Sequence, residues 1–288
     1  MTALLLAGLL ALPASAAGLK VMSWNIGQVY LGGGRESRAD DRDLPRVASV
    51  LMKERPDVAA LQELQDASQL DRLLALMKGA YRGLAAERSG VDRVTAVLVR
   101  AGLSAELVPV SLGRTRPLVA ALLPLPEGPK VAVVSLHLDA FDPAKRLQAV
   151  EDIFAWAGGL RGPLVLAGDF NLDPSQIPSD QPDHPTWRIL VERLDDVGSS
   201  AGPTQVFGLR LDHVLAPSAW LSGSKARVIP DARMRWMDHL PLSAELAFRA
   251  PPSPPAGSAP PAPQVPGAPR RAVAAPRRDP GTRTASGR

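Results

Sequence analysis

Short runs of valine, leucine and alanine recur along the middle of this chain, and they constrain its fold more than any other feature. Apolar runs of about four to eight residues predict strands, whereas apolar residues spaced three or four apart predict helices. We expect strands at residues 19–26, 58–63, 93–100, 105–111, 118–124, 130–138, 163–169, 208–216 and 242–248. We expect helices at residues 41–54, 67–78, 143–157 and 185–194. Because some strands follow one another directly and others alternate with helices, the pattern predicts an α/β architecture with more than one sheet.

The first 17 residues contain no charge and hold an apolar stretch that is followed by proline and small residues. This pattern is typical of a signal peptide, here cleaved near Ala16 or Ala17. The stretch is shorter than the roughly 20 residues of a membrane-spanning helix. No basic residue precedes it, since the first is Lys20, so an apolar first strand is the alternative. We expect residues 1–17 to be a signal peptide and the protein to be secreted or periplasmic, or cytoplasmic if the segment is not a signal.

Residues 251–288 have a different composition, with 11 prolines, six arginines, one acid and no aromatic residue. Such a segment cannot bury enough apolar surface to offset its ordering entropy, so we expect a disordered tail. Because the tail carries +5 and the whole chain +4, residues 1–250 carry a net charge of −1. The isoelectric point of about 9.7 therefore does not indicate a basic nucleic-acid surface on the folded part. A solvated tail is the simpler interpretation, and attraction to DNA, RNA or an anionic envelope is the alternative.

The chain contains no cysteine, which excludes disulfides, thiolate nucleophiles and cysteine-ligated zinc. Residues 18–250 have no internal repeat at solenoid periods and are numerous enough to bury a substantial core. We therefore expect residues 18–250 to form one domain that is stabilised by its apolar core.

Polar residues capable of chemistry cluster where the predicted strands end. They are Asn25, Glu63, His137, the pair Asp169 and Asn171, the pair Asp212 and His213, and the pair Asp238 and His239. Strand ends are where α/β proteins place catalytic groups, and these residue types suit a hard cation and phosphate oxygens. Each cluster alone has a structural explanation, as a turn, a helix start, a core histidine or a surface residue. The prediction of a site depends on their joint occurrence, which takes in three of the four histidines.

Taken in order, these segments resemble the endonuclease/exonuclease/phosphatase superfamily, which includes DNase I-like nucleases, abasic-site endonucleases, inositol phosphatases and secreted sphingomyelinases. The matching segments are Ser23-Trp24-Asn25, Arg46, Pro56-Asp57 with Gln62-Glu63, Leu136-His137, Arg146 with Gln148, Gly168-Asp169-Phe170-Asn171, Pro203-Thr204, Leu211-Asp212-His213 and Asp238-His239-Leu240-Pro241. They span Val21 to about Leu246, which is nearly all of the predicted domain. The Gly-Asp-Phe-Asn and Asp-His-Leu-Pro segments are specific in combination with the upstream Gln-Glu.

The sequence departs from the family pattern at two places. Met237 stands where the family usually has serine, beside an intact Asp238-His239 pair. Gly27 and Gln28 stand where some nucleases have an acidic residue, which counts against a second metal-binding position.

The resemblance implies a four-layer sandwich of two mostly antiparallel sheets flanked by helices, with the site at one rim. It also implies an enzyme, a phosphoester hydrolase that depends on Mg²⁺ or Mn²⁺. The residues that it implies for the metal are Glu63, Asn25 and Asp238. The residues that it implies for catalysis are Asp169, Asn171, His239, His137 and Asp212.

In the implied scheme Asp169 takes a proton from the attacking water, which Asn171 orients. His239, paired with Asp212, binds or protonates the phosphate, and His137 donates to a phosphate oxygen or to the leaving group. The choice of base between Asp169 and His239 stays open.

The sequence marks the substrate less clearly than the chemistry. A nuclease or general phosphodiesterase acting on DNA or RNA agrees with the resemblance, although aromatic residues for base stacking are sparse. The alternative is a phosphatase or phosphodiesterase acting on a small molecule or a lipid head group. The sequence contains no apolar aromatic hairpin of the kind that would suggest membrane insertion. We expect the protein to be a monomer. A non-catalytic binding module on the same scaffold is the third possibility, against which the complete set of site residues argues.

Overall fold

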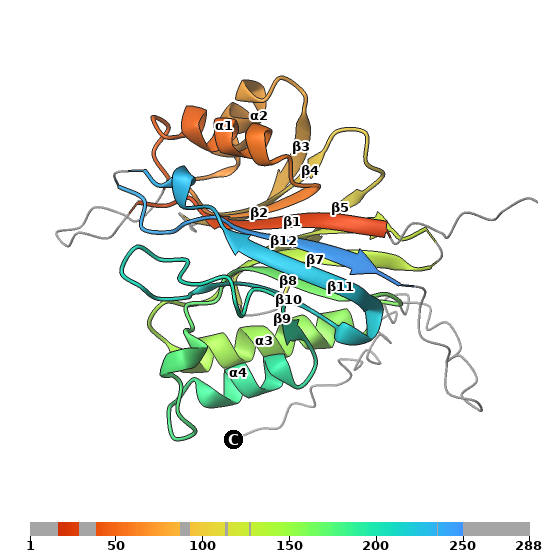
Figure 1. Ribbon diagram of the computed structural model, residues 1–288, viewed down its shortest axis with the longest axis vertical. Coiled ribbons are helices and arrows are strands. Elements are labelled where there is room, and N and C mark those ends of the chain that lie inside the picture. The colour runs from red at the N-terminus through yellow and green to blue at the C-terminus, as the bar shows by residue number, and fades with distance from the viewer. Residues whose placement is uncertain are drawn as a thin grey trace, which may run out of the picture. The chain divides into compact units, whose positions relative to one another are not determined.

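Two six-stranded sheets form the framework of the computed structural model, which describes residues 17–28, 39–86, 93–112, 115–126, 128–234 and 236–249 (Figure 1). The first sheet runs in the order β11 (Leu221–Val228), β12 (Leu242–Phe248), β1 (Ala17–Asn25), β2 (Val58–Leu64), β4 (Val94–Arg100) and β3 (Tyr81–Ala85). The second runs in the order β5 (Glu106–Val110), β6 (Leu118–Pro124), β7 (Lys130–His137), β8 (Leu164–Asp169), β10 (Asp212–Ala216) and β9 (Asp195–Asp196). The predicted tail and all but residue 17 of the predicted signal peptide lie outside the described residues.

Each sheet is mostly antiparallel and contains one parallel pair of neighbouring strands. In the first sheet β1 runs parallel to β2, which sets Asn25 beside Gln62. In the second sheet β7 runs parallel to β8, which sets His137 beside Asp169. Because parallel strands end at the same edge, each pair brings two polar segments together.

The two sheets pack face to face around a shared apolar core. Val21 and Val97 of the first sheet belong to the same buried cluster as Val133 and Val214 of the second. Along β1 the side chains alternate, so that Val21 points to this core while Met22 and Trp24 pack on the outer face. Both faces of the central strands are buried, which explains their nearly continuous apolar sequences.

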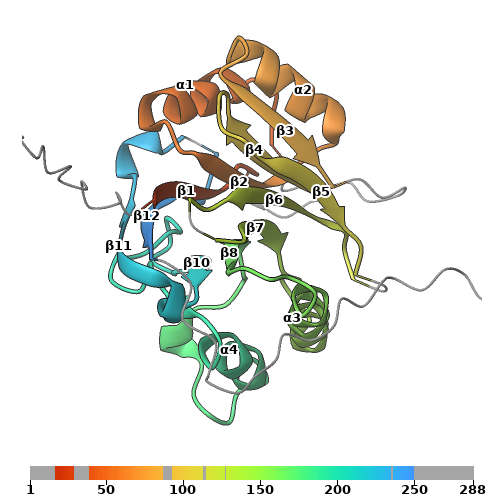
Figure 2. The same ribbon diagram turned by 90° about the vertical axis from the view of Figure 1, so that its right-hand side faces the viewer.

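Four helices cover the outer faces of the sheets. Helices α1 (Leu44–Glu54) and α2 (Ala67–Leu76) lie over the first sheet, and α3 (Pro143–Ala157) and α4 (His184–Val191) over the second (Figures 1 and 2). This four-layer sandwich confirms the predicted fold. Among the described residues no helix is both long and apolar enough to cross a membrane.

Several element boundaries differ from the prediction. Strands β3, β9 and β11 were not predicted; β11 is an exposed edge strand of sequence LSGSKARV, which lacks the alternation of a half-buried strand. The predicted strand at residues 208–216 begins only at Asp212, since the Thr204 hydroxyl accepts hydrogen bonds from the backbone N–H groups of Leu211 and Asp212. That contact holds residues 208–211 in a loop.

Helix boundaries followed the local capping chemistry. Helix α3 begins at Pro143 as predicted, because the Asp142 side chain accepts hydrogen bonds from the N–H groups of Ala144 and Lys145. Helix α1 begins three residues later than predicted, with Pro45 in its first turn. Helix α2 ends at Leu76, and Lys78 beyond it has a left-handed φ of 50°.

Candidate active site

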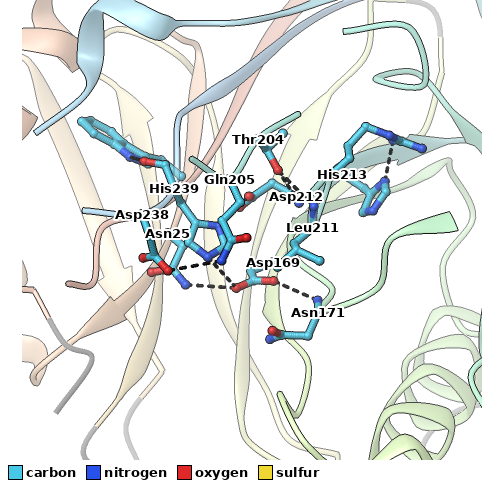
Figure 3. Close-up of polar contacts among 12 residues, drawn as sticks. Asn25, Asp169, Asn171, Thr204, Gln205, Leu211, Asp212, His213, Asp238 and His239 are labelled. Carbon is cyan, nitrogen blue, oxygen red and sulfur yellow. Dashed lines mark hydrogen bonds and ion pairs between the residues drawn. The ribbon is translucent and has the colours of Figure 1, made fainter. Parts of the chain in front are cut away.

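One cleft of about 600 Å³ collects the predicted site residues from both sheets. Its walls include Glu63, His137, Asp169, Asn171, Asp238 and His239. Asn25 and Asp212 are not among the residues that line the cleft, but each contacts one that is: Asn25 contacts Asp169, and Asp212 contacts His239 (Figure 3). All eight residues predicted from the sequence are therefore brought together in space.

Asp169 lies at the centre of the cluster, at the end of β8, and is 1% exposed. Its Oδ2 accepts a hydrogen bond of 3.0 Å from the Asn25 side chain, and its Oδ1 one of 2.8 Å from the Asn171 N–H. The Nε2 atoms of His137 and His239 each lie 3.7 Å from Asp169 Oδ2. The carboxylate is thus held in one orientation between two imidazoles, of which Figure 3 shows that of His239.

His239 is held by a buried partner on the second sheet. Its Nδ1 lies 2.7 Å from Oδ2 of Asp212, and its backbone carbonyl accepts a hydrogen bond from the Trp24 indole N–H. Burial lowers the pKa of His239, but the carboxylates of Asp212 and Asp169 outweigh it and raise this pKa to about 10. At neutral pH His239 is therefore a cation whose second ring N–H faces Asp169.

His137 is held in the opposite protonation state. Burial, aided by the positive charges of Arg116, His239 and Arg93, outweighs the opposing effect of Asp169 and lowers the pKa of His137 to about 4. Its Nε2 lies 3.7 Å from carboxylate oxygens of both Glu63 and Asp169, which favours the neutral tautomer with the proton on Nε2. Asp169 therefore lies between one neutral and one cationic imidazole.

Glu63 enters the cleft through an irregularity in β2. Its backbone has a left-handed φ of 61°, and the register between β2 and β4 shifts between Leu61 and Leu64. Burial and the nearby Asp169 carboxylate raise the pKa of Glu63 to about 8. A Cβ atom on Gly27 would lie 1.9 Å from Glu63 Oε2, so the glycine leaves the space that this carboxylate occupies.

The remaining predicted residues are fixed by loop contacts. Asn171 has a left-handed φ of 50° and donates from its side chain to the Leu138 carbonyl at 3.0 Å. Asp238 is partly buried, and its Oδ2 accepts a hydrogen bond of 3.3 Å from the Gln205 side chain. Gln205 also pairs with His239 through an antiparallel bridge.

The oxygen atoms that line the cleft suit a hard divalent cation that keeps some of its waters, rather than a metal that is enclosed by protein ligands. Glu63 and Asp238 are two carboxylates that line one cleft, which is the oxygen chemistry that Mg²⁺ prefers. Within the described ranges, no three His, Asp or Glu side chains are grouped closely enough to enclose a metal. A cation here would be held by few protein ligands and would keep several waters, as Mg²⁺ commonly does.

His213 is buried and has a structural environment, which excludes the alternative that it is a surface residue. Its Nε2 lies 3.0 Å from the Leu172 carbonyl, and its Nδ1 lies 3.1 Å from Asp196 and 2.9 Å from Arg210. It also packs against the Phe170 ring. His239 is likewise buried, which excludes the same alternative for it.

The cleft also contains residues that sequence reasoning did not identify. They are Gln28, Arg93, Arg116, Leu138, Asp139, Ala140, Phe141, Gln205 and Leu211. Most lie in loops, where no periodic pattern marks the direction of a side chain. Gln205 directly follows the Pro203-Thr204 segment that matches the family, and this was the one sequence feature that could have placed it in the cleft.

Comparisons with known proteins identify the family and the fold. A model of the endonuclease/exonuclease/phosphatase family matches residues 22–254. A comparison with curated proteins gives no match.

Similar solved structures include an endonuclease/exonuclease/phosphatase family protein from Bacteroides thetaiotaomicron, with 18% identity, a TM-score of 0.61, and coverage of 81% of this chain and 98% of that chain. Truncated TDP2 from Caenorhabditis elegans has 19% identity, a TM-score of 0.59, and coverage of 81% of this chain and 98% of that chain. A mannosyl-6-phosphatase from Bacteroides thetaiotaomicron has 18% identity, a TM-score of 0.55, and coverage of 80% of this chain and 100% of that chain. At these identities the likeness shows the fold.

Proposed function

This chain belongs to the endonuclease/exonuclease/phosphatase family, and on that premise we propose that it is a metal-dependent hydrolase of phosphoester bonds in which Asp169 activates the attacking water. One observation carries the proposal. The buried Asp169 carboxylate is oriented by Asn25 and Asn171 and lies between a neutral and a cationic imidazole. This arrangement offers a base, a cation and a hydrogen-bond donor to one phosphoryl group.

In the proposed reaction a water oxygen attacks phosphorus while its proton passes to Asp169. The bond from phosphorus to the leaving oxygen then breaks, and that oxygen takes up a proton from solvent while Asp169 releases to solvent the proton it accepted. The His239 cation, fixed by Asp212, stabilises the negative charge of the phosphoryl oxygens. Neutral His137 donates a hydrogen bond from Nε2, and Asn171 orients the water.

Asp169 is a better candidate for the base than His239. Nδ1 of His239 is bonded to the buried Asp212 carboxylate, which keeps the ring protonated and without a free acceptor nitrogen. Among the described residues Asp169 has no comparably close cationic partner, since its contacts with the two histidines are 3.7 Å long.

Glu63, with Asn25 and Asp238 nearby, would hold the Mg²⁺ or Mn²⁺ ion. When bound, this ion would neutralise charge that builds up on the phosphoryl group or the leaving oxygen.

Hydrolysis of bis(p-nitrophenyl) phosphate by Asp169→Ala and His239→Ala tests the proposal. Each substitution is expected to lower kcat by about 10³-fold, because it removes the base or the phosphate-binding cation. Asp71→Asn, an exposed charge change on α2, serves as the control, and circular dichroism checks the fold. Activity should vanish in EDTA and return with Mg²⁺ or Mn²⁺. Near wild-type turnover in either alanine variant, or full activity in the chelator, would contradict the proposal.

We propose DNA or RNA as the first candidate substrate, and a phosphate ester of a small molecule or a lipid head group as the second. The second is favoured by the net charge of −1 on residues 1–250, which gives the domain no overall attraction for polyanions. A panel of plasmid DNA, RNA, sphingomyelin and inositol phosphates separates the two. DNA cleavage with a steep salt dependence would support the nuclease, and cleavage of one small ester alone would support the second. Ligand binding without turnover would indicate a binding module instead.

Export is proposed from the apolar, uncharged residues 1–17. N-terminal sequencing of the mature protein, expressed with its leader, tests it. A mature protein that begins near residue 17 or 18 is expected, and one that still begins at Met1 would contradict export.

A further inference from the structure

A second cavity of about 470 Å³ adjoins the catalytic cleft on the far side of His137. The two cavities share Arg116, His137, Leu138 and Asp139, so one leads into the other. We call the second cavity the chamber. It lies between the segment that precedes β6, the end of β7 and one face of α3.

The chamber has apolar walls and a polar rim. Leu112, Leu118, Ala149 and Ile153 form much of its lining, while Gln148 and Lys145 lie on the same helix face. A concave, mainly apolar space with a few polar groups is the usual form of a small-molecule site. Its volume exceeds that of a sugar or a nucleoside, each of which occupies roughly 150–250 Å³.

Two arginines lie where the chamber meets the cleft. Arg116 lines both cavities, and Arg93 lines the cleft and a narrow gap that both arginines share with His137. Within the described ranges neither guanidinium forms a hydrogen bond or ion pair, and the Arg93 Nε atom is fully buried. Thr95, which lines the same gap, has a buried hydroxyl that is also without a partner there. Arg116 is exposed to solvent and open to a ligand, whereas the Arg93 Nε atom and the Thr95 hydroxyl are buried donors without a partner, which are costly and therefore suited to receive an acceptor from a ligand.

Asp139, which lines both cavities, is held by contacts with other groups. Its Oδ1 accepts hydrogen bonds from the N–H groups of Phe141 and Asp142, and its Oδ2 lies 3.8 Å from the Lys145 ammonium. Arg116 attracts the Asp139 carboxylate and Arg93 attracts that of Glu63, but neither arginine forms an ion pair with an acid among the described residues.

We infer that the chamber binds the organic group of the substrate, and that Arg93 and Arg116 bind a second anionic group carried by that organic group. The inference rests on the proposed function, because it takes the reacting phosphoryl group to lie at Asp169 and His239. The preferred substrate class is then a small phosphoester with two anionic groups, one at the catalytic cleft and one at the arginines. A bidentate arginine contact suits a phosphate or a carboxylate equally.

Calorimetric binding to the Asp169→Asn chain tests the inference without requiring turnover. The probes are matched pairs that differ by one phosphate: fructose 6-phosphate against fructose 1,6-bisphosphate, and thymidine 5′-monophosphate against thymidine 3′,5′-bisphosphate. We expect the second phosphate to tighten binding about tenfold in at least one pair. Adding Arg116→Gln or Arg93→Gln should abolish that gain and change monophosphate binding much less.

Lys130→Gln is the matched control, because Lys130 begins the strand that His137 ends and its removal changes the net charge equally. It should keep the tenfold gain. Equal binding of both members in both pairs would overturn the inference, and so would an equal loss for mono- and bisphosphate in the arginine variants. Turnover of bis(p-nitrophenyl) phosphate by the wild-type chain is measured separately, so failure of the proposed function is recognised independently.

Filling the chamber provides a second test. Ala149→Leu would place added atoms in the chamber, whereas Ala155→Leu makes the same change at an exposed position of α3. We expect Ala149→Leu to weaken binding of both members of the responsive pair about tenfold, with inorganic phosphate unaffected. Unchanged binding of the organic phosphates, in a variant whose Tm matches that of Ala155→Leu, would exclude the chamber as their site.

Discussion

Gly27 is the residue whose small size the site most clearly requires. Replacing it by alanine would bring a Cβ atom to 1.9 Å from Glu63 Oε2, so the carboxylate must move. Because small displacements in an active site are costly, we expect Gly27→Ala to lower kcat roughly 10²-fold and to raise the Mg²⁺ concentration needed for half-maximal activity. Gly223→Ala is the control, since a Cβ there meets no atom within 4 Å. Equal activity of the two variants in a Mg²⁺ titration would contradict this view of Gly27.

Asp212 sets the charge state of His239 through the 2.7 Å contact with Nδ1. Burial opposes the cation, and the Asp212 carboxylate contributes most to raising the pKa of His239 to about 10. Asp212→Asn should therefore lower this pKa by several units and reduce kcat about 10²-fold or more. NMR titration of the His239 ring proton and a pH–rate profile measure the two effects. An unshifted His239 pKa in the variant would show that another group holds the cation.

The sequence motifs predicted the residues that gather in the candidate site but not the protonation states that distinguish them. Asp169, His137 and His239 could be predicted because each lies in a recognisable segment at a strand end. The opposite pKa shifts of the two histidines could not, since they depend on distances across the two sheets. Arg93 and Arg116 were missed for a related reason: neither belongs to a motif, and only the tertiary structure brings both to His137.

At the scale of the elements, the buried group of Asp196, Arg210 and His213 ties β9 and β10 to the loop before β10. Burial raises the pKa of Asp196, but His213 and Arg210 lower it more, so the net shift is downward. A lowered folded-state pKa stabilises the fold above the unfolded value near 4, and this contribution is lost as the pH falls below it. Asp196→Asn should therefore destabilise the protein by about 3 kcal/mol at pH 7 and by less at pH 3.

Denaturant unfolding at the two pH values measures this difference. Asp195→Asn is the matched control, because Asp195 is the exposed neighbour of Asp196 on β9. It should change stability by less than about 0.5 kcal/mol at either pH. A penalty for Asp196→Asn that is the same at pH 3 and pH 7 would show that packing, rather than charge, dominates at this position.

The elements that the sequence predicted well were those buried on two faces or capped by a defined residue. The run at residues 163–169 became β8 almost unchanged, and Asp142 with Pro143 fixed the start of α3. The edge strand β11 was missed because its side chains are mostly solvent-exposed and its partner β12 provides the pairing that the local sequence does not signal. Strand β3 contains Gly83, which weakens its pattern, yet Gly83 pairs with Leu98 of β4.

At the scale of the whole molecule, the site exists because two sheets present their parallel pairs at one rim. Asn25 and Glu63 come from the first sheet, whereas His137, Asp169 and Asp212 come from the second. The contact between Asn25 and Asp169 joins residues 144 positions apart, so it forms only when the sheets are packed. Catalysis is therefore linked to the integrity of the sandwich core rather than to any one segment.

The charge of the whole chain leads to a test that separates chemistry from polyanion attraction. Residues 251–288 carry +5, and none of the described site residues lies beyond His239. Deleting them should leave kcat and KM for bis(p-nitrophenyl) phosphate unchanged and weaken binding of duplex DNA at low salt. Because each phosphate contact adds about 0.9 to the slope of log K against log salt, losing six arginines should flatten that slope by up to about 5. An altered KM for the small ester would place the tail in the site, and an unaltered DNA slope would make it a solvated segment without a role in binding.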